Sequence, residues 1–538
     1  MLAEEVTSPL VPLPAGGEGM PKAGKRFGGL LLSLACGVAA AIFLSAATKG
    51  GIGISPDSVD YLSMASSDLK YGEFDVTGED GFAESSIHRP VGYPASLALL
   101  GRVFSIDLRR AARLESIAFF GGTAGLLAVW VSTLIGGPVW LPIFSGALFF
   151  LTPDAAAVHA MAWSEPGFLF FGLLGLFFLA LDSGRGRRRL LLAAGVSLGI
   201  CFLYRQAGVV FVLVGTALVC LRGPRRLARA SGVAAVALTP SALFYLRNKL
   251  MAGRATFAAF RIFPLHGSDG SDLVYRFREG LSPDARFFWP SALSLLLIVA
   301  LGLNARRGSL PDRNADAAKK SSFLAISLLI AIYLIFLVSC KIFLFASIPF
   351  DARYLCPILP AGILLLAHGI NRAEPPERSW VIAGGVSLLA GVLLLARCSP
   401  ARRWIQKNQT DSPGYAQIRW EKSGVVAAAR TLAEHEPPGT IFSNSPDLLE
   451  FQTGKRFASL PSRADVFSGL SDQRYPAELR NLSSLVRRGR AFVIYVGPID
   501  WRTNLPNSEG LRRVIGDRYC YNLEDGMVCG LLARGGSR

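Results

Sequence analysis

Two carboxylates that could do chemistry, Asp57 and Asp60, follow directly on an apolar run in the stretch ISPDSVDYLSMA. Ser55 and Pro56, just ahead of them, are typical of a helix start, with Ser55 as the cap and Pro56 in the first turn. In such a helix Asp57, Asp60 and Tyr61 share one face, because residues three and four apart are neighbours. A carboxylate placed in this way can accept a proton from a hydroxyl group, or it can simply cap the helix.

Four cations stand at the ends of apolar runs or inside one. Arg205 and Arg247 each end a run, Arg353 lies in FDARYLCPILP, and Lys341 lies inside SCKIFLFAS. A charge near the middle of a bilayer costs on the order of 3 kcal/mol, so Lys341 is expected to face a cavity or a partner. Arg205 and Arg247 have a plainer alternative, which is that they only snorkel toward lipid headgroups.

The composition places these residues in a membrane protein. The chain has 538 residues, of which 51% are hydrophobic and only 18% are charged, and its mean hydropathy is +0.39. A soluble protein of this length is rarely so apolar. The net charge of +17 does not point to nucleic acid, because the Lys and Arg residues gather in short loops between apolar runs.

The apolar runs predict a mainly α-helical membrane protein with about eleven crossings, each near the ~20 residues that a bilayer requires or shorter. Residues 1–26 are polar and are expected to be disordered and cytoplasmic. The run that follows is too long for a cleavable signal and is expected to stay as an anchor. The candidate crossings are 27–48, 113–134, 137–152, 166–182, 190–204, 207–221, 231–246, 288–304, 322–346, 355–371 and 380–397.

Basic residues set the expected orientation. Lys22, Lys25 and Arg26 precede the first crossing and place the N-terminus in the cytoplasm, and alternation then puts the basic loops 184–189, 222–229 and 305–320 on the same side. The run RRAAR at 109–113 disagrees. We therefore expect 93–112 to form a helix that lies in the outer membrane interface, with its Arg residues turned toward headgroups.

This orientation exports the residues with chemical potential. The outer segments are the first outer loop 49–112, then 153–165, 205–206, 247–287 and 347–354. The residues 27–397 form the membrane module, and everything from 398 to 538 is expected to be an extracytoplasmic α/β domain. In that domain GTIFSN and AFVIYVG read as strands, and PDLLEFQTGK between them reads as a helix.

The cysteines suggest one disulfide and no metal site. Cys520 and Cys529 flank YNLEDGMV, and a turn at EDG would bring them together across a hairpin. The tail is expected to face an oxidising compartment, where a disulfide between them could persist. The alternative is two buried free thiols. Five others fall in or beside apolar runs as small core residues, and no Cys/His metal spacing appears.

Several short motifs, taken in order, carry a resemblance to a known family. They are SPDSVDYL, RPVGYP, WSEPGF, YRQAGVV, FYLRNKLMAG and DARYLCPILP, and the tail segment GTIFSNSPDLLEFQTGKRFASLP adds to them. The chain resembles the GT-C superfamily of membrane glycosyltransferases, specifically the group of dolichyl-phosphate-mannose protein mannosyltransferase-like and aminoarabinose transferase-like enzymes. The HRPVGYP loop and parts of the tail depart from that pattern, which leaves the acceptor open.

The resemblance implies an inverting hexosyl- or pentosyltransferase of the bacterial cytoplasmic (inner) membrane. The expected donor is a sugar on a polyprenyl phosphate, and the acceptor is a cell-envelope lipid, glycan or protein at the outer face. The first-loop acid maps onto Asp57 as the base, with Asp60 as second choice. The second-loop acid, Glu165, maps onto a position near the donor or a divalent ion, so a metal at Glu165, with His159 as a weak further ligand, stays open. Further candidates for binding substrate are Tyr61, His88, Arg89, Tyr93, Arg205, Arg247, Lys341, Arg353 and Tyr354.

Other functions remain compatible with the sequence. One is a ligase that moves a preassembled glycan from polyprenyl diphosphate, and another is a transporter or flippase of a polar or lipid-linked solute. A transporter should show inverted repeats and broken helices near the midplane, and we find no such repeat in the sequence. His159 also has a plain structural alternative, which is that it is a hydrogen-bonded loop residue rather than a ligand.

The expected orientation is tested by reporter fusions. A fusion at Gly186, within a basic loop, should report the cytoplasm, and a fusion at Gly535, near the end of the tail, should report the periplasm. Both fusions on the same side would refute the orientation.

Overall fold

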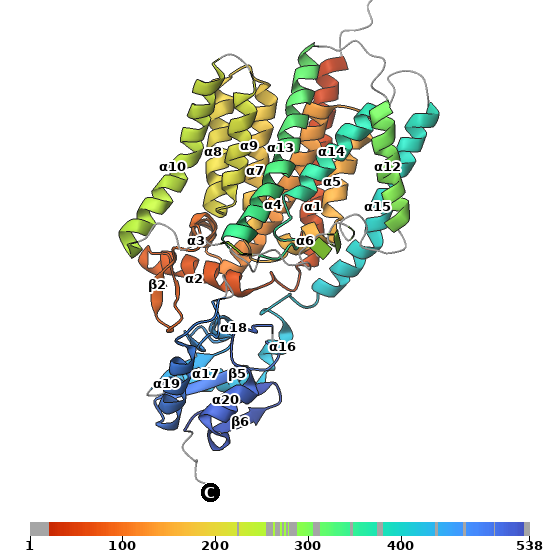
Figure 1. The fold of residues 1–538 in the computed structure, drawn as a ribbon. Helices are drawn as coiled ribbons and strands as arrows, with labels where there is room; N and C mark the ends of the chain where they lie inside the picture. The colour runs from red at the N-terminus through yellow and green to blue at the C-terminus, as the bar shows by residue number, and fades with distance from the viewer. Residues whose placement is uncertain are drawn as a thin grey trace, which may run out of the picture.

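The computed structural model describes residues 21–222, 225–253, 262–263, 270–271, 274–275, 278, 288–304, 313–344, 348–373, 380–435, 439–465, 470–499 and 501–531. Within these residues the chain forms a helical bundle with a smaller α/β domain at one end (Figure 1). We call this end of the bundle the domain end. The predicted disordered N-terminus lies outside the described residues as far as residue 20, as do most of the outer segment 247–287 and residues 305–312 of a basic loop.

Long apolar helices form the bundle, because a backbone in lipid must satisfy its hydrogen bonds within the helix. Six described helices are long and apolar enough to cross a membrane, or seven if α5 and α6, bent by 62°, count as one span. The expected count of about eleven is not supported, since α5, α9 and α14 have only 11, 13 and 16 residues. The bundle helices are α1 (Pro21–Ala47), α4 (Leu108–Trp130) with the π-turn η1 (Val131–Ile135), α5 (Trp140–Phe150), α7 (Glu165–Asp182), α8 (Arg188–Tyr204), α9 (Gly208–Cys220), α10 (Arg226–Ala252), α12 (Phe288–Asn304), α13 (Arg313–Phe343), α14 (Ile358–Ala373) and α15 (Trp380–Asn408).

Glycines let two of these helices approach closely. A Cβ atom on Gly37 of α1 would lie 2.9 Å from the backbone oxygen of Gly121 in α4, and one on Gly121 would lie 2.7 Å from the oxygen of Gly37. Such contacts are typical of membrane helices that pack without large side chains between them. They fix α4, and with it the start of α4 at the domain end.

The segments at the domain end carry the candidate residues. The helix expected at Pro56 is present, and its cap is confirmed: Ser55 Oγ accepts from Ser58 N (3.3 Å) while Ser58 Oγ accepts from Ser55 N (3.0 Å). Gly72 ends the helix in the left-handed region, with φ of 73°. The elements at this end are α2 (Pro56–Tyr71), the hairpin β1 (Asp75–Thr77) and β2 (Ala83–Ser85), α3 (Gly92–Phe104) and α6 (Pro153–His159).

The single interfacial helix expected over 93–112 is only partly right. α3 ends at Phe104, and Asp107 starts a new helix, its Oδ1 accepting from Arg109 N (3.1 Å) and Arg110 N (3.0 Å). The RRAAR run therefore forms the first turns of the spanning helix α4. α3 itself exposes Leu99, Val103 and Phe104, as a helix in a membrane interface would.

The tail folds as a small α/β unit. Its five-stranded sheet has the order β4-β3-β5-β7-β6, with β3 parallel to β4 and β5, and β7 antiparallel to β5 and β6. The two expected strands and the helix between them are present as β3, β5 and α18. The expected boundary at 398 falls inside α15, which continues to Asn408. The elements are α16 (Ile418–Glu421), α17 (Gly424–Glu434), β3 (Thr440–Ser443), α18 (Pro446–Thr453), β4 (Ala458–Ser459), α19 (Tyr475–Arg487), β5 (Ala491–Val496), α20 (Ser508–Ile515), η4 (Asp517–Tyr519), β6 (Cys520–Leu523) and β7 (Gly526–Cys529).

Main-chain bonds dock this unit on the residues just before α2. Ile54 N donates to Pro413 O (3.1 Å), and Tyr415 N donates to Ile54 O (2.8 Å). Gly414 between them has a φ of 76°, and a Cβ there would lie 2.0 Å from Ile54 O, so only glycine fits. On α2 itself, Ser63 Oγ donates to Glu450 Oε1 of α18 (2.7 Å). The acid-bearing helix is thus held between the bundle and the α/β domain.

The hairpin of β6 and β7 pairs Cys520 with Cys529, and the structure contains the disulfide between them. We expect both cysteines to be unreactive toward a maleimide in the denatured, unreduced protein and reactive after reduction, because a sulfur in a disulfide cannot be alkylated. Mass spectrometry of the tryptic peptides measures this. Cys398, which is exposed and free, is the internal control and should react in both samples. Equal labelling of Cys520 and Cys529 before and after reduction would refute the bond.

Candidate active site

Six charged side chains from five segments meet at the domain end of the bundle and alternate in sign. Three are acids and three are arginines, so the group is neutral as a whole. We call it the charge chain. Its order is Asp60–Arg89–Asp57–Arg353–Glu165–Arg205. Three of the five ion pairs join Arg89 Nη2 to Asp60 Oδ2 (3.1 Å), Arg353 Nη1 to Asp57 Oδ2 (2.5 Å) and Arg205 Nη1 to Glu165 Oε1 (2.5 Å). In the other two, Arg89 directly contacts Asp57 and Arg353 directly contacts Glu165.

The ends of helices place these residues. Asp57 and Asp60 lie on one face of α2, as their spacing predicted. Glu165 is the first residue of α7, and Arg205 follows the last residue of α8. Arg353 lies in the segment that leads into α14. Because α7 and α8 are antiparallel neighbours, the start of one and the end of the other reach the same end of the bundle (Figure 1).

Aromatic rings line the guanidinium groups. The guanidinium carbon of Arg353 lies 4.3 Å from the centre of the Trp163 ring, and that of Arg205 lies 5.3 Å from the Tyr354 ring. Arg89 lies 5.5 Å from the ring of Tyr61. These distances fall within the range of cation–π attraction, which holds a guanidinium in place while leaving its N–H groups free to donate.

One donor of the charge chain is left over. Arg353 Nη2 is buried and has no hydrogen-bond partner among the residues that the structure describes. The nitrogen Nη1 of the same group pairs with Asp57, and Nε pairs with Glu165. An arginine presents its donors in a planar fork that suits phosphate oxygens, so Nη2 offers a point of attachment for an anion.

The two acids of α2 differ in basicity. Burial would raise the pKa of Asp57, but the charges of Arg89 and Arg353 outweigh it and hold the pKa well below its usual range. Burial raises the pKa of Asp60 to about 6, against the attraction of Arg89 and with the help of the negative charge of Asp57. Asp60 keeps 38% of its side chain exposed, so water moderates this effect on stability.

A cavity of about 790 Å³ opens beside the charge chain. Ala352, Leu355 and Cys356, which lie close to Arg353 in the sequence, belong to its wall. The rest of its wall is almost entirely apolar and comes mainly from α5, α6, α13, α14 and α15. Its polar members are Thr152, Asp154, His159 and Arg397. A hollow of this size and polarity suits a hydrocarbon chain.

Several expected site residues lie outside the charge chain. Lys341 is buried, and its Nζ donates to Ile348 O (2.7 Å) beside the ring of Phe350. Arg247 Nη1 donates to Ser86 O (2.9 Å). Both cations thus bind backbone carbonyls, a contact that sequence alone does not distinguish from a contact with a ligand.

The remaining candidates for binding substrate are three tyrosines and His88. Tyr61 and Tyr354 contact the arginines, as described. Tyr93 is buried beneath Tyr61, with the two rings edge-to-face at 5.1 Å. His88 lies next to Arg89, and its backbone oxygen accepts from Gln206 Nε2 (3.4 Å).

The donor set bears on the open question of a metal. Among the described residues no group of three His, Cys, Asp or Glu side chains could hold a metal ion. Glu165 Oε1 is shared by two arginines, and His159 Nδ1 bonds to Ala155 O (2.7 Å). The described residues thus bring together no three ligands for a divalent ion, and we assign no step to one.

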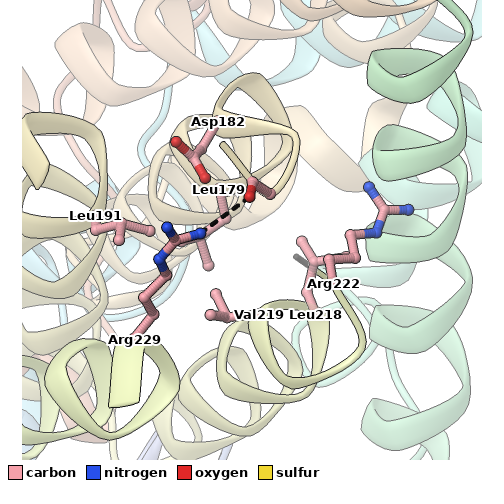
Figure 2. A pocket seen from close by; sticks show the side chains of 8 residues that line it. Leu179, Asp182, Leu191, Leu218, Val219, Arg222 and Arg229 are labelled. Atoms are coloured by element: carbon pink, nitrogen blue, oxygen red, sulfur yellow. Dashed lines mark hydrogen bonds between the residues drawn. The ribbon is translucent and has the colours of Figure 1, made fainter. Parts of the chain in front are cut away.

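A second hollow lies at the opposite end of α7 and is structural (Figure 2). Asp182 oxygens accept from Gly186 N (2.9 Å) and Arg187 N (2.7 Å), and Arg229 Nη1 donates to Gly184 O (3.0 Å). Its volume of about 10 Å³ holds one water at most. The polar groups here lock the turn between α7 and α8.

Some residues that build the site were missed in the sequence. Trp163 supports Arg353, and its Nε1 donates to Ser55 Oγ (2.7 Å); Ser164 Oγ bonds to Tyr61 Oη (3.0 Å). A Trp-Ser pair just before a buried acid was the available signal, but nothing in the sequence shows which segment it faces.

No family model matches the chain, and no curated protein matches it in sequence. Solved structures do match in fold. ArnT from Cupriavidus metallidurans, bound to undecaprenyl phosphate, is 13% identical with a TM-score of 0.54, and the match covers 93% of this chain and 98% of that one. The archaeal oligosaccharyltransferase AglB from Archaeoglobus fulgidus, in complex with an inhibitory peptide and a dolichol-phosphate, is 10% identical with a TM-score of 0.56, covering 87% and 70%.

A third match is the arabinofuranosyltransferase AftD from Mycobacteria, at 16% identity and a TM-score of 0.53, which covers 87% of this chain and 35% of that one. At such low identity these likenesses establish the fold alone. The chain therefore shares the fold of these three solved structures, which agrees with the resemblance that its motifs carry.

The two acids of α2 should give opposite pH dependence of stability. Free Asp has a pKa of about 3.9. Asp60, with its raised pKa, contributes stability near pH 4 that is lost as the pH rises through about 6. Asp57, with its lowered pKa, contributes stability above about pH 4 that is lost as the pH falls further. Melting temperatures in detergent from about pH 3 to 7 should show the wild-type advantage falling with pH against Asp60→Asn and rising against Asp57→Asn. The same slope for both variants would contradict the assignment.

Proposed function

We propose that this protein is an inverting glycosyltransferase that moves a sugar from a polyprenyl-phosphate donor to a hydroxyl of a cell-envelope acceptor, at the outer face of a bacterial cytoplasmic membrane. The observation that carries the proposal is the charge chain beside the apolar cavity: an acid, an arginine with a spare donor and a wall for a hydrocarbon chain occur together. The shared fold supports it, and the undecaprenyl phosphate and dolichol-phosphate in the ArnT and AglB structures are the same class of lipid.

The donor phosphate would bind at Arg353. Its spare Nη2 can donate to a phosphate oxygen. In the charge chain, Arg205 and Arg89 are the next arginines on either side of Arg353. The polyprenyl chain would then enter the cavity, whose wall begins at the neighbours of Arg353. Apolar burial there supplies affinity, while the arginine fork fixes the phosphate.

Asp57 would act as the base. The acceptor hydroxyl passes its proton to a carboxylate oxygen of Asp57 as its own oxygen attacks the anomeric carbon. The bond between that carbon and the phosphate oxygen breaks, and its electron pair leaves with the polyprenyl phosphate. Arg353 and its neighbours stabilise the added negative charge of the leaving phosphate. One displacement inverts the configuration, and no covalent intermediate with the protein is needed.

The ion pairs suggest why the donor must bind first. Asp57 is a weak base while Arg89 and Arg353 both neutralise it. A phosphate that takes up the donors of Arg353 competes with Asp57 for them, so Asp57 becomes more basic when the donor is present. This order would keep the base inactive in the absence of a sugar donor.

Asp57→Asn should abolish transfer while the protein still folds and inserts, because the amide keeps the size but cannot accept the proton. A general base contributes about 10²–10⁴-fold, and a loss of that size in turnover is expected with reconstituted enzyme and lipid-linked sugars. Asp60→Asn should cost less, since the ion pair of Asp60 among the described residues is with Arg89, and Asp60 does not pair with Arg353 there. Wild-type turnover in Asp57→Asn together with loss in Asp60→Asn would mean that the other acid is the base.

Arg353→Lys should weaken use of the donor more than use of the acceptor, because lysine lacks the planar fork with which a guanidinium binds a phosphate bidentately. A charge-assisted contact is worth about 1.5–3 kcal/mol, so the KM for the donor should rise about 10- to 150-fold. The matched control is Arg113→Lys, since Arg113 binds Ser45 O (2.9 Å) and Thr48 away from the charge chain. An unchanged donor KM in correctly inserted Arg353→Lys would remove the phosphate site from the proposal.

A further inference from the structure

Three consecutive backbone carbonyls directly before Arg89 are each held by a side chain from another segment. Two of these side chains come from the end of α10, and one follows α8. We call these three side chains, Arg247, Asn248 and Gln206, the carbonyl clamp. The bonds run from Arg247 Nη1 to Ser86 O (2.9 Å), from Asn248 Nδ2 to Ile87 O (3.3 Å) and from Gln206 Nε2 to His88 O (3.4 Å).

The clamp has a defined orientation. Asn248 is fully buried, and its Oδ1 accepts from Arg247 Nη1 (3.2 Å). Its amide nitrogen is therefore the group that faces Ile87 O. Arg247 thus bonds both to the loop and to the neighbouring member of the clamp, so the two act as one unit.

The clamped segment needs outside support. Residues 86–91 lie between β2 and α3 and belong to no helix or strand. Within the segment Ser86 Oγ accepts from Arg89 N, at 3.5 Å. Yet the side chain of Arg89 must reach both Asp57 and Asp60, which requires a fixed backbone. Three carbonyls in a row with external donors supply that fixation.

We propose that Arg247 and Asn248 are positioning residues that act through Arg89 on Asp57. The proposal rests on the proposed function only in that Asp57 is the base; the placement of Arg89 is a separate property. Arg247 then acts on the backbone of the site rather than on a phosphate. Loss of the clamp should lower turnover and leave the donor KM unchanged, because Arg353 is not disturbed.

The first test measures the segment without any activity. Asn248→Asp keeps the size and the acceptor for Arg247 but replaces the donor to Ile87 O with an oxygen. Amide hydrogen exchange of residues 85–91, followed by mass spectrometry of the full-length protein in nanodiscs, should become faster in this variant. The matched control is Asn371→Asp, because Asn371 Nδ2 also donates to a backbone carbonyl, Ile135 O (3.1 Å), at the other end of the bundle. Unchanged exchange in Asn248→Asp would overturn the proposal.

The second test asks whether the clamp acts through Arg89. Loss of one such bond should lower kcat about five- to tenfold in the wild-type background. It should have no further effect in an Arg89→Gln background, since residues that act as a unit are not additive. Multiplying losses, or a raised donor KM, would overturn the proposal. If no polyprenyl-phosphate sugar supports turnover in the wild type, the proposed function fails, while the exchange result still decides the clamp.

Discussion

The alternation of charge in the chain from Asp60 to Arg205 is the constraint on which the site depends. Removing an ion from water costs several kcal/mol even after relaxation, so each buried charge needs an opposite partner. Glu165 is fully buried and can remain an anion only between two arginines. Arg353 in turn needs both Glu165 and Asp57. The six groups therefore form a single neutral assembly in which every interior member has an opposite charge on each side.

This constraint explains the surroundings of the site. The acids on α2 must be held in place relative to the arginines. The backbone bonds of Ile54 with Pro413 and Tyr415 hold the start of α2 from the side of the α/β domain. Gly414 permits that contact because any side chain would strike Ile54 O. Arg89 lies on an irregular segment and depends on side chains of α10 for its place. The α/β unit and the end of α10 thus help to hold the charge chain in place.

The same arrangement suits a reaction that creates negative charge on a lipid phosphate. A site that already balances three arginines against three carboxylates can exchange one carboxylate contact for a phosphate at little electrostatic cost. The apolar cavity begins beside Arg353, so the charged and hydrocarbon parts of a lipid-linked donor meet complementary walls at one point. Charge pairing, rather than any single residue, links the free protein to the proposed chemistry.

The sequence by itself determined the membrane character, the capped helix that carries Asp57 and Asp60, the strands of the tail and the fold that the ordered motifs predicted. The membrane character, the helix and the strands follow from local properties: hydropathy, caps and spacing within one element. The fold followed from the resemblance that the ordered motifs carry. The sequence also named every member of the charge chain among its candidates, some because they follow apolar runs and others because they belong to the motifs that carry the resemblance. The expected number of crossings is not supported, since a short apolar run reads alike whether it spans a bilayer or packs inside a bundle.

Only the tertiary structure decided which cation meets which acid. Arg353 and Lys341 look equivalent in the sequence, yet one joins two carboxylates and the other bonds to Ile348 O. Arg247 and Arg205 both end an apolar run in the sequence, yet one holds a loop and the other pairs with Glu165. The reason is physical: a pairing depends on distances of a few ångströms between segments far apart in the chain, and the packing of whole helices sets those distances.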